Sequence, residues 1–126
     1  MKPSFRDLLG KKFAPHGRGP ENYDCYGLAI EVLKRYGKQL IDVQYVDDNR
    51  EFNSHVIHSF TSSFLILEVE VPNEGDLIVI RVGGTPSHLG VYIGDGKYIH
   101  ASRKGVQIET MTSIRNKIEG FYRWQQ

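Results

Sequence analysis

The first hydrophobic pattern along the chain has helical spacing. Between residues 25 and 36, apolar side chains recur every three or four positions and fall on one face of a helix. These side chains are Leu28, Ala29, Val32, Leu33 and Tyr36. Asp24 stands before the run as a good N-cap, and Gly37 stands after it as a C-terminal stop. The pattern predicts an amphipathic helix over residues 25–36.

A second pattern, typical of strands, fills the other half of the chain from Pro72 onward. Short runs rich in β-branched and aromatic residues predict strands at 76–82, 89–93, 97–101, 106–109 and 120–124. Residues 38–70 alternate poorly, and there we expect a short strand or irregular segment followed by a helix around residues 50–62. Helices first and strands afterwards indicate an α+β fold, with N-terminal helices packed on a C-terminal antiparallel β-sheet.

Length and charge limit the protein to a few classes. The 126 residues fit one domain with a single hydrophobic core. No repeat, low-complexity tract or linker marks a boundary, so we expect a single domain over residues 1–126. The net charge of +1 gives no electrostatic reason to expect nucleic acid as a partner.

The beginning of the sequence bears on where the protein is found. Residues 1–12 are charged and lack the run of about 7–15 apolar residues that a signal peptide needs. No stretch approaches the roughly 18 apolar residues of a membrane span. We therefore expect a soluble protein without a signal peptide or membrane span, cytoplasmic as synthesised.

The single cysteine, Cys25, stands where a loop gives way to the predicted helix. The preceding residues 15–22 contain two glycines and two prolines, which indicates an ordered loop leading to the thiol. A cysteine in the first turn lies beside unpaired backbone N–H groups and the positive end of the helix dipole, which favours thiolate over thiol. One cysteine excludes an internal disulfide, so the thiol is free to react.

Two histidines belong to a strand-turn-strand pattern: His88 directly precedes the predicted strand 89–93, and His100 lies in the predicted strand 97–101. If the turn between them is Asp95-Gly96 alone, the two rings point to opposite sides of the sheet. If the loop is three residues, 94–96, then Gly90 faces His100, and the two histidines become diagonal neighbours on one face. Their β-carbons would then be roughly 7–8 Å apart, which two imidazole rings can bridge. A cysteine nucleophile with a histidine base and a histidine orienter is the chemistry that this arrangement favours.

The other histidines and a metal site are further candidates for a role in chemistry. His16 has no such company, and we interpret His55 and His58 as part of a solvated helix or loop face. One cysteine and two histidines are also an allowed zinc ligand set, but no metalloenzyme motif accompanies them. We expect neither a metal nor another cofactor.

Four segments together carry a resemblance to a known family. Residues 24–28 read Asp-Cys-Tyr-Gly-Leu and resemble an Asp-Cys-Ser-Gly-Leu nucleophile motif, and residues 72–77 resemble a Pro-Gly-Asp-Leu strand start. Residues 87–94 resemble a His-Val-Gly-Ile-Tyr-Ile-Gly strand, and residues 98–102 resemble the segment that carries a third catalytic group. In order and spacing the chain resembles the NlpC/p60 family of cell-wall cysteine peptidases, which have a circularly permuted, papain-like α+β fold.

The resemblance implies a Cys-His-His triad. Cys25 would be the nucleophile, His88 the general base that later protonates the leaving amine, and His100 the group that orients His88. Backbone N–H groups at the helix start would stabilise the oxyanion. The implied substrate is a peptidoglycan stem peptide, cleaved after γ-D-glutamate.

The same resemblance also concerns residues around the triad that would contact the oxyanion or the substrate. Phe13 stands where the family often has a tyrosine, and Tyr26 stands where it usually has a serine. These departures concern substrate geometry and rate. Oxyanion or substrate contacts are expected from Phe13, Arg18, Asp24, Tyr26 and Ser87, and arginines near the motifs that could pair with substrate carboxylates are Arg18, Arg81 and Arg103. A solvated surface charge is the commoner role for each arginine.

Other functions remain open. The loop before Cys25 is most similar to that of phage tail-associated members of the family, which implies tail proteins as partners and a protein that reaches the wall within a virion. The rivals are a tail assembly module with a weak or vestigial site, and a related cysteine acyltransferase or amidase toxin that uses the same cysteine and histidine.

Overall fold

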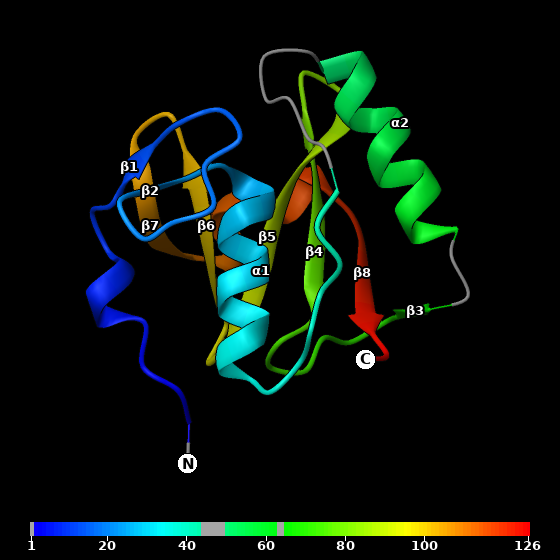
Figure 1. The fold of residues 1–126 in the computed structure, drawn as a ribbon. Coiled ribbons are helices and arrows are strands. Elements are labelled where there is room, and N and C mark those ends of the chain that lie inside the picture. The colour runs from blue at the N-terminus through cyan, green and yellow to red at the C-terminus, as the bar shows by residue number, and fades with distance from the viewer. Residues whose placement is uncertain (1, 44–49, 63–64) are drawn as a thin grey trace.

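The computed structural model describes residues 2–43, 50–62 and 65–126 (Figure 1). Two helices, α1 (Cys25–Arg35) and α2 (Arg50–Thr61), accompany a six-stranded antiparallel sheet in the order β3-β8-β4-β5-β6-β7. The strands are β3 (Ile66–Val69), β4 (Leu77–Val82), β5 (Thr85–Gly94), β6 (Lys97–Ser102), β7 (Gly105–Thr110) and β8 (Ile118–Trp124). Short 3₁₀ helices, η1 (Arg6–Leu8) and η2 (Met111–Lys117), and a small parallel pair, β1 (Lys12–Phe13) with β2 (Asn22–Tyr23), complete the fold.

The helix predicted from Cys25 is confirmed, and its two ends show why it forms there. Asp24 accepts a hydrogen bond from the backbone N–H of Gly27 at 2.6 Å, which caps the first turn. At the other end Gly37 adopts a positive φ of 81° and donates to the carbonyl of Lys34, while Lys38 donates to the carbonyl of Leu33. These two bonds form the motif in which a left-handed glycine ends a helix.

The five predicted strands are also confirmed, with differences at the edges. β5 begins at Thr85, four residues before the predicted start. The sequence pattern missed these residues because Pro86, which pairs beside a bulge at Ile80 and Arg81, breaks the hydrophobic alternation there. β3 was not predicted from the irregular pattern of residues 38–70, and it forms by pairing with β8. The helix expected around residues 50–62 is α2; part of the short strand or irregular segment expected before it, residues 44–49, lies outside the described residues.

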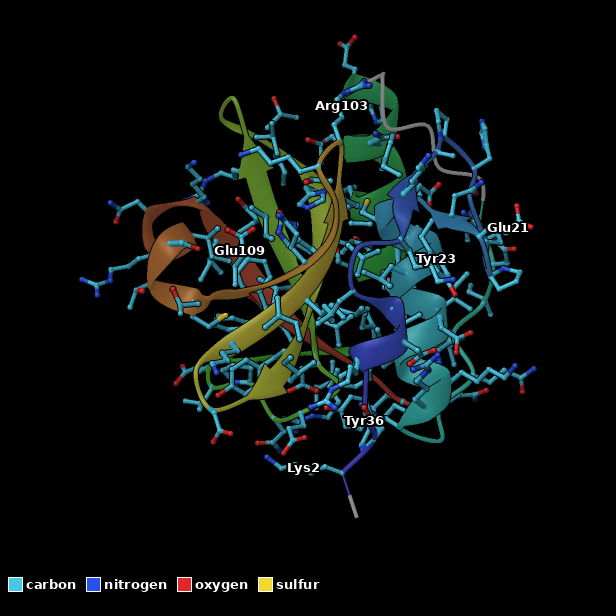
Figure 2. All side chains as sticks on the ribbon, turned by 90° about the vertical axis from the view of Figure 1, so that its left-hand side faces the viewer. Lys2, Glu21, Tyr23, Tyr36, Arg103 and Glu109 are labelled. Atoms are coloured by element: carbon cyan, nitrogen blue, oxygen red, sulfur yellow. The ribbon has the colours of Figure 1, made fainter. Side chains whose placement is uncertain are left out.

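The sheet separates two apolar clusters of unequal size. α1 packs on one face against alternate residues of the central strands, among them Leu89, Val91 and Ile99. On the other face η2 covers a smaller cluster that includes Ile80, Tyr98 and Ile114. In Figure 2 Glu109 lies on the η2 side of the sheet and Tyr23 on the α1 side, which gives the three layers α1, sheet and η2. Alternation along β5 and β6 therefore decides which residues face which layer.

Candidate active site

The register of the β5–β6 hairpin decides whether the two predicted histidines meet. Gly94 pairs with Lys97 across a two-residue turn in which Asp95 and Gly96 have positive φ values of 56° and 71°. Beyond a bulge at Ile93, Tyr92 pairs with Tyr98 and Val91 with Ile99. Continued along the strands, this register sets Gly90 opposite His100, as expected for the three-residue loop. The protein reaches that register with a shorter turn and an added bulge.

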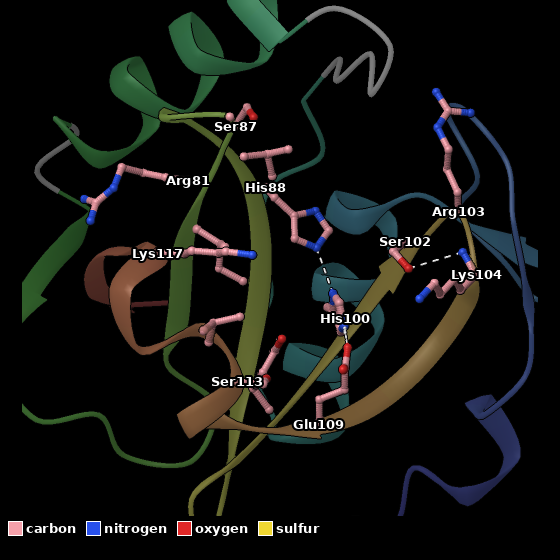
Figure 3. Close-up of a pocket in the computed structure, with 15 residues that line it drawn as sticks. Arg81, Ser87, His88, His100, Ser102, Arg103, Lys104, Glu109, Ser113 and Lys117 are labelled. Carbon is pink, nitrogen blue, oxygen red and sulfur yellow. Dashed lines mark hydrogen bonds and ion pairs between the residues drawn. The ribbon is translucent and has the colours of Figure 1, made fainter.

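His88 and His100 are in direct contact (Figure 3). Nε2 of His88 lies 2.8 Å from Nδ1 of His100, and the ring centroids are 5.1 Å apart at 75°. The absence of a side chain at Gly90 serves a neighbouring ring: a β-carbon there would lie 2.9 Å from Cδ2 of Tyr98. The Tyr98 ring in turn lies against His100, with centroids 4.8 Å apart. Gly90 thus makes room for the Tyr98 ring, which packs against His100.

A third group, Glu109 on β7, was missed by sequence reasoning. Its Oε2 lies 2.5 Å from Nε2 of His100, so that His100 stands between His88 and a carboxylate. The signal was available in the next hairpin, because a two-residue turn after Ser102 sets Tyr98 opposite Glu109 and makes Glu109 the diagonal neighbour of His100.

The environment of His88 favours the neutral ring. Burial, together with the nearby His100 ring, lowers the pKa of His88 from its ordinary value to about 3. A neutral imidazole has one nitrogen that accepts a proton, and where Nε2 donates to His100 that nitrogen is Nδ1. His88 therefore has the form that a general base requires at neutral pH.

Cys25 is the first residue of α1, and its side chain is 1% exposed. It belongs to the apolar cluster that also contains Leu89 and Ala101, the immediate chain neighbours of His88 and His100. α1 contacts both β5 and β6. The helix that begins with Cys25 thus packs against the two strands that carry the histidines.

The loop before Cys25 is tied to the helix start by Arg18. Its guanidinium donates to Asp24 Oδ1 at 2.8 Å, to the carbonyl oxygen of Gly17 at 3.0 Å, to Asp42 at 2.9 Å and to the carbonyl oxygen of Val43 at 3.0 Å. These partners belong to the protein itself. The structure therefore shows Arg18 as a tie between segments. A substrate contact by Arg18 stays a prediction from sequence.

Asp24 and Tyr26, the other two predicted contacts at the helix start, face inward. Asp24 is fully buried, and its Oδ2 has no hydrogen-bond partner among the described residues. The Tyr26 hydroxyl donates to the carbonyl oxygen of Ile41, and its ring meets Phe60 edge-on at 6.1 Å. Tyr26 therefore fills the core beneath the helix start, where the family motif usually has a small serine.

Phe13 and Ser87 lie at the edges of the site. The Phe13 ring is half-buried in β1 and lies 5.8 Å below the guanidinium carbon of Arg103. Ser87 is buried and its hydroxyl donates to the carbonyl oxygen of Thr85 at 3.2 Å.

A pocket of about 640 Å³ opens on the η2 side of the sheet and includes both histidines (Figure 3). Its charged lining comprises Arg81, Arg103, Lys104, Lys117 and Glu109. Glu109 contacts His100, and Arg81 pairs with Glu119 at 2.8 Å, so cationic side chains dominate the wall. Lys104 and Lys117 were not foreseen from sequence. The pocket is lined by His88 and His100, whereas Cys25 is not among its lining residues.

Within the described ranges, no group of three or more His, Cys, Asp or Glu side chains is arranged to hold a metal ion. No helix in the described part of the chain is long and apolar enough to cross a membrane.

Comparison with known proteins identifies the family. The sequence profile described as the NlpC/P60 family matches residues 10–118. The chain belongs to the NlpC/P60 family. Among curated proteins, "Probable endopeptidase p60" of Listeria grayi is 29% identical over 103 residues, covering 82% of this chain and 18% of that protein. "Murein DD-endopeptidase MepS/Murein LD-carboxypeptidase" of Escherichia coli K12 is 28% identical over 109 residues, covering 85% of this chain and 51% of that protein.

Solved structures of NlpC/P60 proteins share the fold. The NlpC/p60 domain of the peptidoglycan hydrolase SagA superposes with a TM-score of 0.63 at 18% identity, covering 94% of this chain and 91% of that domain. NlpC1 from Trichomonas vaginalis gives a TM-score of 0.65 at 25% identity, covering 94% of this chain and 41% of that chain. The papain-like arrangement of helices on an antiparallel sheet is therefore the fold of this chain. The match with this chain spans about half the length of MepS and less than a fifth of the length of p60.

Proposed function

We propose that this protein is a cysteine peptidase that hydrolyses amide bonds in the stem peptides of bacterial peptidoglycan, with Cys25 as nucleophile, His88 as base and His100 as orienter. The observation that carries the proposal is the 2.8 Å contact between Nε2 of His88 and Nδ1 of His100 on strands packed against the helix that begins with Cys25. Membership of the NlpC/P60 family and the endopeptidase names of its relatives support it.

The reaction follows from the roles of the three side chains. The Cys25 sulfur attacks the amide carbonyl while its proton passes to Nδ1 of His88, and backbone N–H groups at the start of α1 stabilise the oxyanion. His88 then gives that proton to the departing amine, which leaves an acyl-thioester. Water attacks the thioester with His88 as base, and the proton returns to the sulfur as the carboxylic acid leaves. His100 holds the His88 ring throughout.

The cationic pocket wall supports an acidic peptide as substrate. A stem peptide cleaved after γ-D-glutamate carries a carboxylate close to the scissile bond. Lys104 and Lys117 line the pocket beside the histidines, and both are suited to contact that group as point charges. We assign these two lysines to carboxylate recognition and leave Arg18 to its internal partners.

The test is digestion of purified muropeptides by the wild type and by Cys25→Ala, followed by mass spectrometry. Cleavage of one stem-peptide amide by the wild type alone supports the proposal and names the bond. Intact substrate in both samples contradicts it and favours the vestigial module. Parallel reactions with an added amine detect acyl transfer, which would appear as an amide product in place of the free acid. Partnership with phage tail proteins stays a prediction from sequence.

A further inference from the structure

We propose that Glu109 is a positioning residue that fixes the tautomers of both histidines, so that Nδ1 of His88 is free to accept the thiol proton. The inference rests on the proposed function for its catalytic meaning. Its structural content, a carboxylate that sets the direction of two hydrogen bonds, stands independently of any substrate.

The geometry of the contact supports this role. His100 is 8% exposed and has both ring nitrogens engaged, one by His88 at 2.8 Å and the other by Glu109 at 2.5 Å. Glu109 reaches the ring from the next strand, diagonally across the β6–β7 ladder. The Tyr98 ring packs against His100 and limits its rotation. The imidazole is thus held on three sides by side chains from β5, β6 and β7.

Counting protons gives the direction of each bond. An ionised carboxylate only accepts hydrogen bonds, so Nε2 of His100 must carry the proton that faces Glu109. In neutral His100 the other nitrogen, Nδ1, is then an acceptor, and the proton in the contact with His88 must sit on Nε2 of His88. Neutral His88 consequently has its lone pair on Nδ1. The tautomer that can deprotonate a thiol is the one that Glu109 selects through His100.

Without the carboxylate the opposite arrangement becomes available. His100 could carry its proton on Nδ1 and donate to Nε2 of His88, which would place the proton of neutral His88 on Nδ1. In that tautomer His88 cannot accept a proton from Cys25 on the nitrogen that remains. A serine protease triad whose aspartate is replaced by its amide fails for the same reason.

The Glu109 carboxylate also stabilises the positive charge that forms on His88. During attack His88 becomes an imidazolium, which burial beside His100 disfavours. A negative charge behind His100 partly offsets that cost. The other ionisable groups around the relay are those of the pocket wall and the packed ring, and any change in pH dependence must be referred to them as well: Arg81, Tyr98, Arg103, Lys104 and Lys117.

The matched control is Gln107, on the same strand. It stands directly opposite His100 in the β6–β7 register, and within the described residues it makes no hydrogen bond to either ring. Gln107→Ala therefore shortens a side chain of equal length on β7 and leaves the carboxylate in place. Glu109→Ala removes the relay partner, and Glu109→Gln keeps an acceptor while removing its charge.

The first experiment is ¹⁵N NMR of the histidine rings without substrate. We expect one tautomer for His88 and His100 in the wild type and in Gln107→Ala, and a mixture or the reverse in Glu109→Ala. In Glu109→Gln the Nε2 proton of His100 should move upfield, because the hydrogen bond is no longer charge-assisted. Unchanged ring signals in both Glu109 variants would overturn the inference, and the glutamine variant decides if the alanine variant does not fold.

The second experiment measures muropeptide hydrolysis as a function of pH. Glu109→Ala should lower kcat about 10-fold to 100-fold with KM within about 2-fold, and Glu109→Gln should fall between it and the wild type. Gln107→Ala should match the wild type. Equal kcat in Glu109→Ala and Gln107→Ala would contradict the inference. If the wild type itself hydrolyses nothing, the proposed function fails, while the ring signals still decide the role of Glu109.

Discussion

Gly27, in the first turn of α1, lies directly against the carbonyl oxygen of Gly17, so that a β-carbon at residue 27 would overlap that oxygen. The same oxygen accepts hydrogen bonds from the backbone N–H of Asp24 and from Arg18. Because Gly27 has no side chain, the preceding loop can pack closely over the start of the helix that carries Cys25.

Replacing Gly27 by alanine is expected to destabilise the protein, against helix propensity. Alanine in a helix interior is favoured over glycine by about 1 kcal/mol, but displacing a packed backbone carbonyl costs about 1–3 kcal/mol. We expect a net loss of up to about 2 kcal/mol in the free energy of unfolding, measured by urea denaturation. An equal or higher midpoint would show that the loop moves away without cost.

Replacing Asp24 separates its two roles. Asp24→Ala removes both the N-cap and the partner of Arg18, and we expect it to lower the free energy of unfolding by about 1–2 kcal/mol. Asp24→Ser keeps a capping oxygen and removes only the ion pair. The serine variant should therefore be the more stable of the two in denaturation, and equal stability of the two variants would assign the loss to the Arg18 pair instead of the cap.

The pKa of His88 predicts a loss of stability in acid. The folded-state value of about 3 lies below the ordinary 6.5, so below pH 6.5 the unfolded state binds the extra proton. Stability should fall from about pH 6.5 towards pH 3, with a contribution from this residue of at most about 3 kcal/mol at pH 4.5.

The comparison for this pH dependence is His88→Gln, which cannot titrate. Unfolding free energies of both proteins between pH 4.5 and pH 8 should converge in slope above pH 6.5 and diverge below it. Parallel curves throughout that range would mean that His88 is accessible to protons in the folded state.

The lysines of the pocket wall are expected to affect substrate binding more than turnover. Lys104→Ala and Lys117→Ala should each raise KM for an acidic muropeptide about 3-fold to 10-fold, with kcat within about 2-fold. Added salt should weaken binding of the wild type more than that of the variants. Lys97→Ala, an exposed lysine of β6 outside the pocket, is the control. A muropeptide lacking the free carboxylate should remove the difference between wild type and variants.

The sequence predicted those parts of the site that depend on local patterns. Periodicity and capping residues placed Cys25 at the first position of a helix, and alternation placed His88 and His100 in adjacent strands. Their register depended on the bulge at Ile93, which alternation alone does not reveal. Without a bulge, the two-residue turn that the protein uses would have set the rings on opposite faces.

What sequence could not supply are partners that are distant along the chain. Arg18 meets Asp42 and Val43 through tertiary packing, and no spacing rule connects those positions. β3 forms because β8 provides an edge to pair with, and the composition of β3 alone does not predict a strand. Glu109 lies between these cases, because the register of the β6–β7 hairpin would have placed it beside His100.

The relay and the nucleophile differ in how the chain must assemble them. His88, His100 and Glu109 come from three consecutive strands joined by tight turns, so their contacts close short loops at little entropic cost. The helix that begins with Cys25 docks on β5 and β6 across about half the sequence. In refolding, we therefore expect the paired histidines to form before the helix that carries Cys25 docks, so that the proposed nucleophile joins the relay late.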